Sequence, residues 1–273
     1  MSYLLLTDTV RALHCGTTPL LSSTELDIAM PGSSVSKLHE TYALLFQLRA
    51  TLPADLTSSD DAIILLVTIL SDYLSIQSSL RLLVSPSTHR GAAPVFDPKH
   101  SHHVNPFVPL SPTTELARIK DNLRAALSRW HDIFGDRCSE DVTALYFYCR
   151  LALECPHIWC LPELAGYPSN DTTRTDSPGK FNEALPVTDE ALRMAWLVVE
   201  SIDMKKATLR SRLSIWLPVV VFHAALVVWQ KLESTDSRTY GSLRVLTVFE
   251  KELTKMPWPC TLQMVETLQM LIR

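Results

Sequence analysis

Hydrophobic residues recur at every third or fourth position in a series of segments along this chain, which is the spacing of one helical face. The most regular series consists of Leu116, Ile119, Leu123, Leu127, Trp130 and Phe134, and it spans about five turns. Ser111 and Pro112 form a suitable start for this helix, and Gly135 forms a suitable stop. This segment is therefore the clearest predicted helix of the chain.

Shorter series with the same spacing flank this segment. They are Val35, Leu38, Tyr42, Leu45 and Phe46; Ile63, Leu66, Val67, Leu70 and Leu74; and, on either side of a break at MPWP, Leu243, Leu246, Phe249 and Leu253 with Met264, Leu268 and Leu271. Ser139 and Thr188 are each followed by two acidic residues, as expected for helix N-caps beside the positive end of the helix dipole. The pattern predicts an all-α fold of roughly eight or nine helices.

The most apolar stretch, SIWLPVVVFHAALVVWQ, occupies residues 214–230. From Leu213 to Trp229 it has seventeen residues, the lower limit for a membrane-spanning helix, and Pro218 and His223 interrupt it. Pro218 is tolerated in a first helical turn, where its missing N–H would have no intrahelical partner. We therefore predict a central core helix, apolar on every side, with no membrane contact. We expect His223 to be a hydrogen-bonded core residue rather than a ligand or base.

Two segments lack periodicity and predict long exposed loops. Residues 84–112 contain six prolines and four histidines, and residues 162–187 are rich in Pro, Ser, Asn, Asp and Thr. A hydrophobic core shared across these loops and a division into two domains both fit the pattern. We treat residues 1–273 as a single helical domain.

Composition and charge narrow the possible functions. The chain has only 7 glycines against 17 prolines, which favours helices separated by proline-marked loops. Its net charge of −4 gives no general attraction to a phosphate backbone, so we expect no direct sequence-specific DNA binding. The N-terminus has no basic start and only a short apolar run, which is not typical of a secretory signal. The six cysteines are therefore expected to be reduced thiols inside the cell.

Two clusters contain residues that can bind metals. Cys149, Cys155, His157 and Cys160 fall within twelve positions, and thiolates with imidazole are what zinc prefers. Their spacing does not form the paired knuckles of structural zinc sites, so we predict packed free cysteines instead. A second cluster, His100, His102 and His103, has no acidic or cysteine partner nearby and is expected to lie in a solvated loop.

Enzyme motifs are missing or incomplete. Asp60-Asp61 and Asn170-Asp171 do not form the aspartate-rich and Asn/Asp motifs that the magnesium sites of a helical terpene cyclase need. No GxSxG, HExxH, P-loop or GxGxxG pattern occurs. We therefore predict no enzyme activity, no catalytic residues, no cofactor and no metal.

A basic cluster precedes the apolar stretch and consists of Lys205, Lys206, Arg210 and Arg212. It could act as a weak nuclear-localisation patch or as the positive flank of a membrane span. The favoured interpretation is that these residues complement the negative C-terminal end of the preceding helix.

Four segments have a familiar order: LLLTDTVRALHCGTTPLLSSTELDIAMPGS at 4–33, ALYFYCRLALECPHIW at 144–159, IWLPVVVFHAALVVW at 215–229 and LRVLTVFEKELTKMPWPCTLQMVETL at 243–268. Together they resemble the fungal-specific transcription factor domain, the middle homology region that follows the zinc-finger DNA-binding module in many fungal regulators. The resemblance is spread over most of the chain. In that family a Pro-Cys pair, often followed by a tryptophan, leads into a helix, whereas this chain has Pro31-Gly32 and Leu38. The family's Trp-Pro-Cys is retained as Trp258-Pro259-Cys260.

The resemblance implies a regulatory domain without its DNA-reading module, because neither the six-cysteine zinc cluster nor finger spacings of two cysteines and two histidines occur. The chain would be the C-terminal portion of such a domain: a fragment, a truncated gene product or a stand-alone partner of a complete factor. Its partners would be proteins, including a complete factor or a second copy, or a small apolar effector. The family implies a nuclear location, and without it we expect a cytoplasmic one. The alternative is a helical small-molecule-binding or adaptor protein outside transcription.

Overall fold

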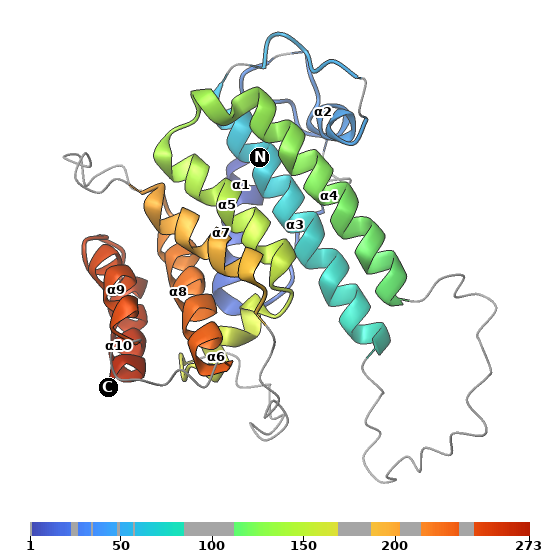
Figure 1. The fold of residues 1–273 in the computed structure, drawn as a ribbon. Helices are drawn as coiled ribbons and strands as arrows, with labels where there is room; N and C mark the ends of the chain where they lie inside the picture. The colour runs from blue at the N-terminus through green and yellow to red at the C-terminus, as the bar shows by residue number, and fades with distance from the viewer. Residues whose placement is uncertain are drawn as a thin grey trace, which may run out of the picture.

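The structure is a computed structural model that describes residues 2–22, 27–33, 35–47, 50–56, 58–84, 112–168, 187–202, 214–234 and 243–273. These residues contain ten α-helices, and the predicted all-α fold is confirmed (Figure 1). The helices are α1 (Ser2–Cys15), α2 (Leu38–Leu45), α3 (Ser59–Val84), α4 (Pro112–Phe134), α5 (Glu140–Glu154), α6 (Leu161–Leu164), α7 (Asp189–Glu200), α8 (Leu217–Ser234), α9 (Leu246–Thr254) and α10 (Cys260–Ile272). The count exceeds the expected eight or nine in part because α6 has only four residues, too few to show a hydrophobic period.

Helix α8 is the centre of the fold, as the apolar stretch predicts. It contacts α5 and α7 on one side and α9 and α10 on the other, and α1 and α6 also reach it (Figure 1). Buried residues occur at almost every position from Leu217 to Val228, including Phe222 and His223. Burying a Val, Leu or Phe side chain contributes about 1.5–3 kcal/mol each, so a helix without a polar face is stable only in such surroundings. Pro218 lies in the first turn, where the helix loses no hydrogen bond.

Helices α3, α4 and α5 form a second packed group beside this centre (Figure 1). The buried Trp130 of α4 joins all three helices. Its indole N–H donates to the carbonyl of Ala62 on α3 at 3.0 Å, and its ring stacks on Tyr146 of α5 with centroids 5.4 Å apart. The predicted end of this helix before Gly135 is confirmed, and the α4 stripe faces the core because its hydrophobic positions share one side.

The two predicted N-caps differ in their chemistry. Thr188 precedes α7, and its hydroxyl accepts a hydrogen bond from the backbone N–H of Ala191 at 3.0 Å. Ser139 stands at the N-cap of α5, but its hydroxyl donates to the Asp141 carboxylate and caps no backbone N–H. Only Thr188 satisfies one of the free N–H groups at its helix start.

The helical face expected from Val35 to Phe46 is only partly correct. Helix α2 begins at Leu38, and Val35 is 85% exposed. Residues 28–38 instead double back, with an antiparallel bridge between Ala29 and Lys37 and a bond from the Leu38 N–H to the carbonyl of Ile28 at 2.8 Å. These backbone bonds compete with a helical start, so the helical spacing of Val35 is coincidental.

The bend of this doubled-back segment is held by Asp61 at the start of α3. The buried Asp61 carboxylate accepts hydrogen bonds from the backbone N–H groups of Gly32 at 2.8 Å and Ser58 at 3.2 Å. A Cβ atom at Gly32 would lie 2.3 Å from this carboxylate and 2.9 Å from the Cβ of Ser58. The Pro31-Gly32 pair therefore fits a turn whose inner side is already filled by Asp61.

The two predicted loops lie largely outside the described residues. Of residues 84–112, only the two end positions are described, as the last residue of α3 and the first of α4. Of residues 162–187, positions 162–164 belong to α6, so this loop begins later than expected, and 169–186 lie outside the described residues.

Among the described residues one helical segment, Ser59–Ser79 of α3, is long and apolar enough to cross a membrane by length and composition alone. Two thirds of it (67%) is buried inside the fold. A core helix meets the same criteria.

Candidate functional site

A histidine–tyrosine pair is buried in the centre of the fold. Tyr148 of α5 and His223 of α8 form a hydrogen bond of 2.7 Å between the phenol oxygen and Nδ1. Burial lowers the pKa of His223 to about 3, and the nearby His14 lowers it further, so the imidazole is neutral. Burial also raises the pKa of Tyr148. The pair is a satisfied core contact with no solvent access, in agreement with the prediction for His223.

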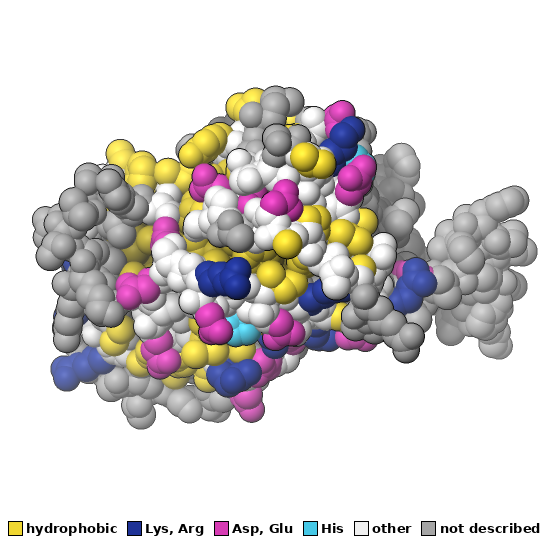
Figure 2. Space-filling view, turned by 90° about the horizontal axis from the view of Figure 1, so that it is seen from above, with side chains coloured by type: hydrophobic (Ala, Val, Ile, Leu, Met, Phe, Trp, Pro, Cys, Tyr) yellow, Lys and Arg dark blue, Asp and Glu magenta, His cyan; other side chains and the backbone are white. Residues whose placement is uncertain are grey.

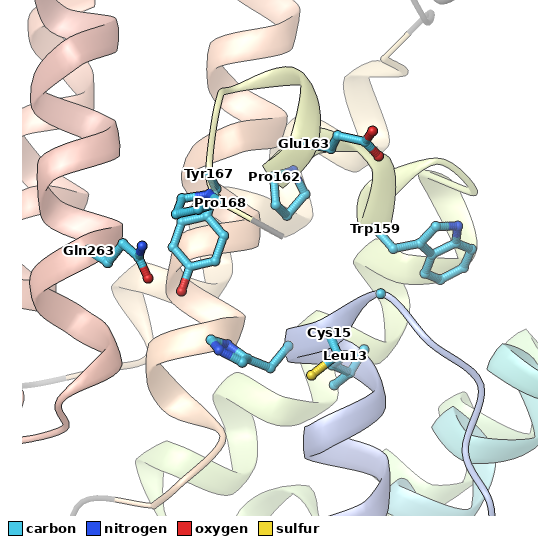
Figure 3. A pocket seen from close by; sticks show the side chains of 10 residues that line it. Leu13, Cys15, Trp159, Pro162, Glu163, Tyr167, Pro168 and Gln263 are labelled. Atoms are coloured by element: carbon cyan, nitrogen blue, oxygen red, sulfur yellow. The ribbon is translucent and has the colours of Figure 1, made fainter. Parts of the chain in front are cut away.

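A small cavity opens between the end of α1, the α6 region and α10 (Figure 3). Its volume is about 60 Å³. Leu13 and Pro162 are apolar residues of its lining, and His14 and Tyr167 are polar ones. A single water needs about 10–15 Å³, so the cavity has room for a few waters or a ligand group of a few non-hydrogen atoms.

Three polar side chains converge on this cavity from three parts of the chain. Figure 3 shows the Gln263 carboxamide of α10 and the Tyr167 hydroxyl directed toward the same space. His14 also lines this space. Tyr167 is only 8% exposed, and its ring packs edge-on against His14 with centroids 6.0 Å apart. None of the three side chains forms a hydrogen bond to another described residue. Buried polar groups normally have partners, so the hydroxyl of the buried Tyr167 is available to a water or a ligand. The side chains of the half-buried His14 and the exposed Gln263 are available in the same way.

The His14, Tyr167 and Gln263 side chains of the cavity are uncharged near neutral pH. Partial burial lowers the pKa of His14, and burial raises the pKa of Tyr167 to about 12. No lysine or arginine lines the cavity among the described residues, and the one carboxylate, Glu163, points outward at the rim (Figure 3). The interior therefore offers neutral donors and acceptors and no counter-charge for an ion.

Aromatic contacts connect the cavity to the core. The ring of Tyr167 lies 5.0 Å from that of Phe222 on α8, and His223 is the next residue along the helix. The row from His14 through Tyr167 and Phe222 to His223 therefore joins the cavity to the central helix. The sequence gives no signal for this site, because its residues are far apart in the chain and belong to no spacing motif.

A second hollow is larger and mostly apolar. It lies between α1, α3 and the start of α8, is lined by Tyr3, Ile63 and Trp216, and has a volume of about 340 Å³. Asp60 brings one carboxylate to its edge.

On the face that Figure 2 shows, acidic and basic side chains are interspersed among hydrophobic ones, and no field of a single sign forms.

The predicted cysteine cluster is spread over several structural positions. Cys149 is buried in α5 with its Sγ 3.9 Å from the Leu66 carbonyl, and Cys155 is buried just after that helix. His157 and Cys160 lie in the turn that follows, both partly exposed. Burial raises the pKa of Cys149 and raises that of Cys155 to about 11, which opposes the thiolate form that zinc binds. No three potential metal ligands in the described part of the chain lie close enough to hold an ion.

The remaining candidate residues lie partly inside and partly outside the described part of the chain. Asp60 and Asp61 lie in the first turn of α3, where Asp61 binds backbone N–H groups as described above. The following lie outside the described residues: His100, His102, His103, Asn170, Asp171, Lys205, Lys206, Arg210 and Arg212. Trp258 and Pro259 lie between α9 and α10, and Cys260 is the first residue of α10.

Comparisons with protein-family models, with curated proteins and with solved structures found no match to this chain.

Proposed function

We propose that the chain is a helical transcription-regulatory domain, similar to the fungal-specific transcription factor domain, that acts through protein or effector contacts rather than by reading DNA. The observation that carries this proposal is the spatial position of the four resembling segments. They contribute α1, α5, α8 and the α9–α10 pair, and each of these packs on α8 or is part of it. The resemblance thus involves one connected core rather than scattered surface pieces.

The first test is a reporter assay with the complete chain fused to an unrelated DNA-binding module. We expect the fusion to raise or lower transcription from the module's site relative to the module alone. A matched fusion with Phe222→Ala, which removes a core ring of α8, should lose the effect. No change in transcription by the stably expressed wild-type fusion would contradict the proposal.

The second test concerns DNA itself. At physiological salt the purified chain should show at most weak, salt-sensitive binding that does not depend on sequence, because its net charge is −4. Zinc analysis should find less than one ion per chain. Tight sequence-specific binding, or one tightly held zinc per chain, would overturn the claim that the chain lacks a DNA-reading module.

A second candidate function is binding of an apolar small molecule outside transcription. The hollow of about 340 Å³ between α1, α3 and Trp216 favours it, because ligand pockets are about 300–1,000 Å³ and mostly apolar. An apolar fluorescent dye should then bind with saturation, and Ile63→Glu should abolish this binding. Saturable dye binding together with an inactive reporter fusion would favour this second function over the first.

A further inference from the structure

We propose that the cavity between α1, α6 and α10 is a binding site for a small neutral group that has both a hydrogen-bond donor and an acceptor, such as a primary carboxamide. The proposal does not rest on the proposed function, because it concerns only what the cavity can bind. It begins from Tyr167, a residue that is 8% exposed and whose hydroxyl, directed into the cavity, has no partner among the described residues.

The position of the polar groups gives the cavity its specificity. Gln263 contributes a carboxamide from α10 and Tyr167 a hydroxyl from the segment after α6 (Figure 3). His14 contributes a neutral imidazole from the end of α1. Each of these groups can both donate and accept a hydrogen bond when neutral. A ligand with one donor and one acceptor can therefore pair with at least two of them at the same time.

Charge selects against ionic ligands. No described lysine or arginine lines the cavity, and partial burial lowers the pKa of His14, so an anion would find no positive partner at neutral pH. A cation would find only Glu163, which points outward at the rim. Transfer of an ion into such a space without a counter-charge costs far more free energy than transfer of a neutral amide, and the amide can regain its cost through hydrogen bonds to the cavity.

The volume of the cavity also restricts the ligand to a small group. A volume of about 60 Å³ admits a group of only a few non-hydrogen atoms, and Leu13 and Pro162 provide apolar lining for a methyl or methylene beside it. Acetamide is therefore a suitable probe. Acetate and methylammonium are charged controls of similar size.

A bound ligand would also connect parts of the fold that have few contacts with each other. Helix α10 packs mainly on α9 and α8, and the cavity is where Gln263 faces α1 and the α6 region. A molecule bonded to Gln263 and to His14 or Tyr167 would bridge these elements. The aromatic row through Phe222 places this bridge next to the central helix.

The experiment is an NMR titration of the complete chain labelled with ¹⁵N at glutamine and histidine. Acetamide should shift the Gln263 side-chain and His14 ring signals with saturation, and acetate and methylammonium should bind at least ~10-fold more weakly. Tyr167→Phe and Gln263→Leu should each weaken acetamide binding by roughly 3- to 10-fold, the range of one hydrogen bond. Glu266→Gln, an exposed change on the same helix, should leave it unchanged.

Three outcomes would overturn the proposal. One is the absence of any saturable shift with acetamide, which would mean that the cavity holds only water. Another is acetate or methylammonium binding as tightly as acetamide. The third is unaltered acetamide binding in both the Tyr167→Phe and the Gln263→Leu chains, since both variants remove groups that the proposal requires.

Discussion

Two histidine–tyrosine pairs in the described part of the chain, one in the core and one at the cavity, differ in almost every respect except composition. In the core, His223 and Tyr148 share a hydrogen bond of 2.7 Å and are closed off from solvent. At the cavity, His14 and Tyr167 meet only through an edge-on ring contact, and neither polar group is bonded to a described residue. The hydrogen bond of the first pair joins helix α5 to helix α8. The polar atoms of the second pair can hydrogen-bond a water or a ligand in the cavity.

Phe222 is where the two pairs meet, and its loss should have the largest effect. Its ring is 1% exposed and packs against Tyr167. We expect Phe222→Ala to lower the free energy of unfolding by about 3–5 kcal/mol through lost burial and a residual cavity, measured by urea denaturation. Leu262→Ala, at a 67% exposed position on α10, should change it by less than about 0.5 kcal/mol. Equal effects of the two changes would contradict the central position of α8.

Acid should weaken the fold through the core histidine more than through the cavity histidine. The pKa of His223 is about 3 in the fold against 6.5 for an unperturbed histidine, so between these values the unfolded chain binds a proton that the native chain does not. Stability therefore falls as pH drops from about 6.5 toward 3, by at most about 1.4 kcal/mol per pH unit.

The matched variants are His223→Gln and His14→Gln. Urea denaturation at several pH values should show a much flatter pH dependence for His223→Gln than for the wild type. The change for His14→Gln should be in the same direction but smaller, because partial burial lowers its pKa less completely. The pKa of Asp8, which is also lowered, contributes only at more acidic pH, below its usual 3.8. An unchanged profile in His223→Gln would refute this origin of acid sensitivity.

Removing one hydroxyl from each pair compares the pairs directly. Tyr148→Phe leaves the Nδ1 atom of His223 buried without its partner, which should cost about 1–3 kcal/mol of unfolding free energy. Tyr167→Phe removes a hydroxyl that has no described partner, so it should change stability by less than about 0.5 kcal/mol. Denaturation of both variants under one condition tests this difference, and a larger cost for Tyr167→Phe would reverse the comparison.

The smallest effect is expected at the mouth of the cavity. Gln263→Ala on α10 removes a carboxamide that bonds to no described residue. The unfolding free energy of this variant should therefore match that of the wild type within about 0.5 kcal/mol. Glu266→Ala, an exposed change on the same helix, should also match the wild type within this range. Thermal unfolding can measure both. A clear loss for Gln263→Ala alone would show that the carboxamide has a structural bond and is not free for a ligand.

Most of the helices could be predicted from sequence because their signal is local. A helix is indicated within a single segment by the hydrophobic series from Leu116 to Phe134, and another by the acidic residues after Thr188. The segment from Val35 to Phe46 shows the limit of such a signal. Its spacing is helical, but backbone bonds to residues six to ten positions earlier in the chain keep its first part extended.

The cavity could not be predicted because no local pattern contains it. His14, Tyr167 and Gln263 are brought together only by the packing of α1, α6 and α10, and α6 itself is too short to have a period. The partner of His223 was equally hidden, because Tyr148 is seventy-five positions earlier in the chain. Asp61 had a recognisable signal, since a serine three residues before an acidic residue is typical of a reciprocal helix cap.

The burial of α8 on all sides has a consequence for how the protein opens. Its amide hydrogens are enclosed by α5, α7, α9 and α10, so they should exchange with deuterium only when the whole core separates. Helix α10 rests mainly on α9 and α8, and its amides should exchange through a smaller opening that leaves α8 intact. Gln263 at the mouth of the cavity thus lies on a helix that should open first, whereas Tyr167 of the cavity packs on Phe222 of the helix that should open last.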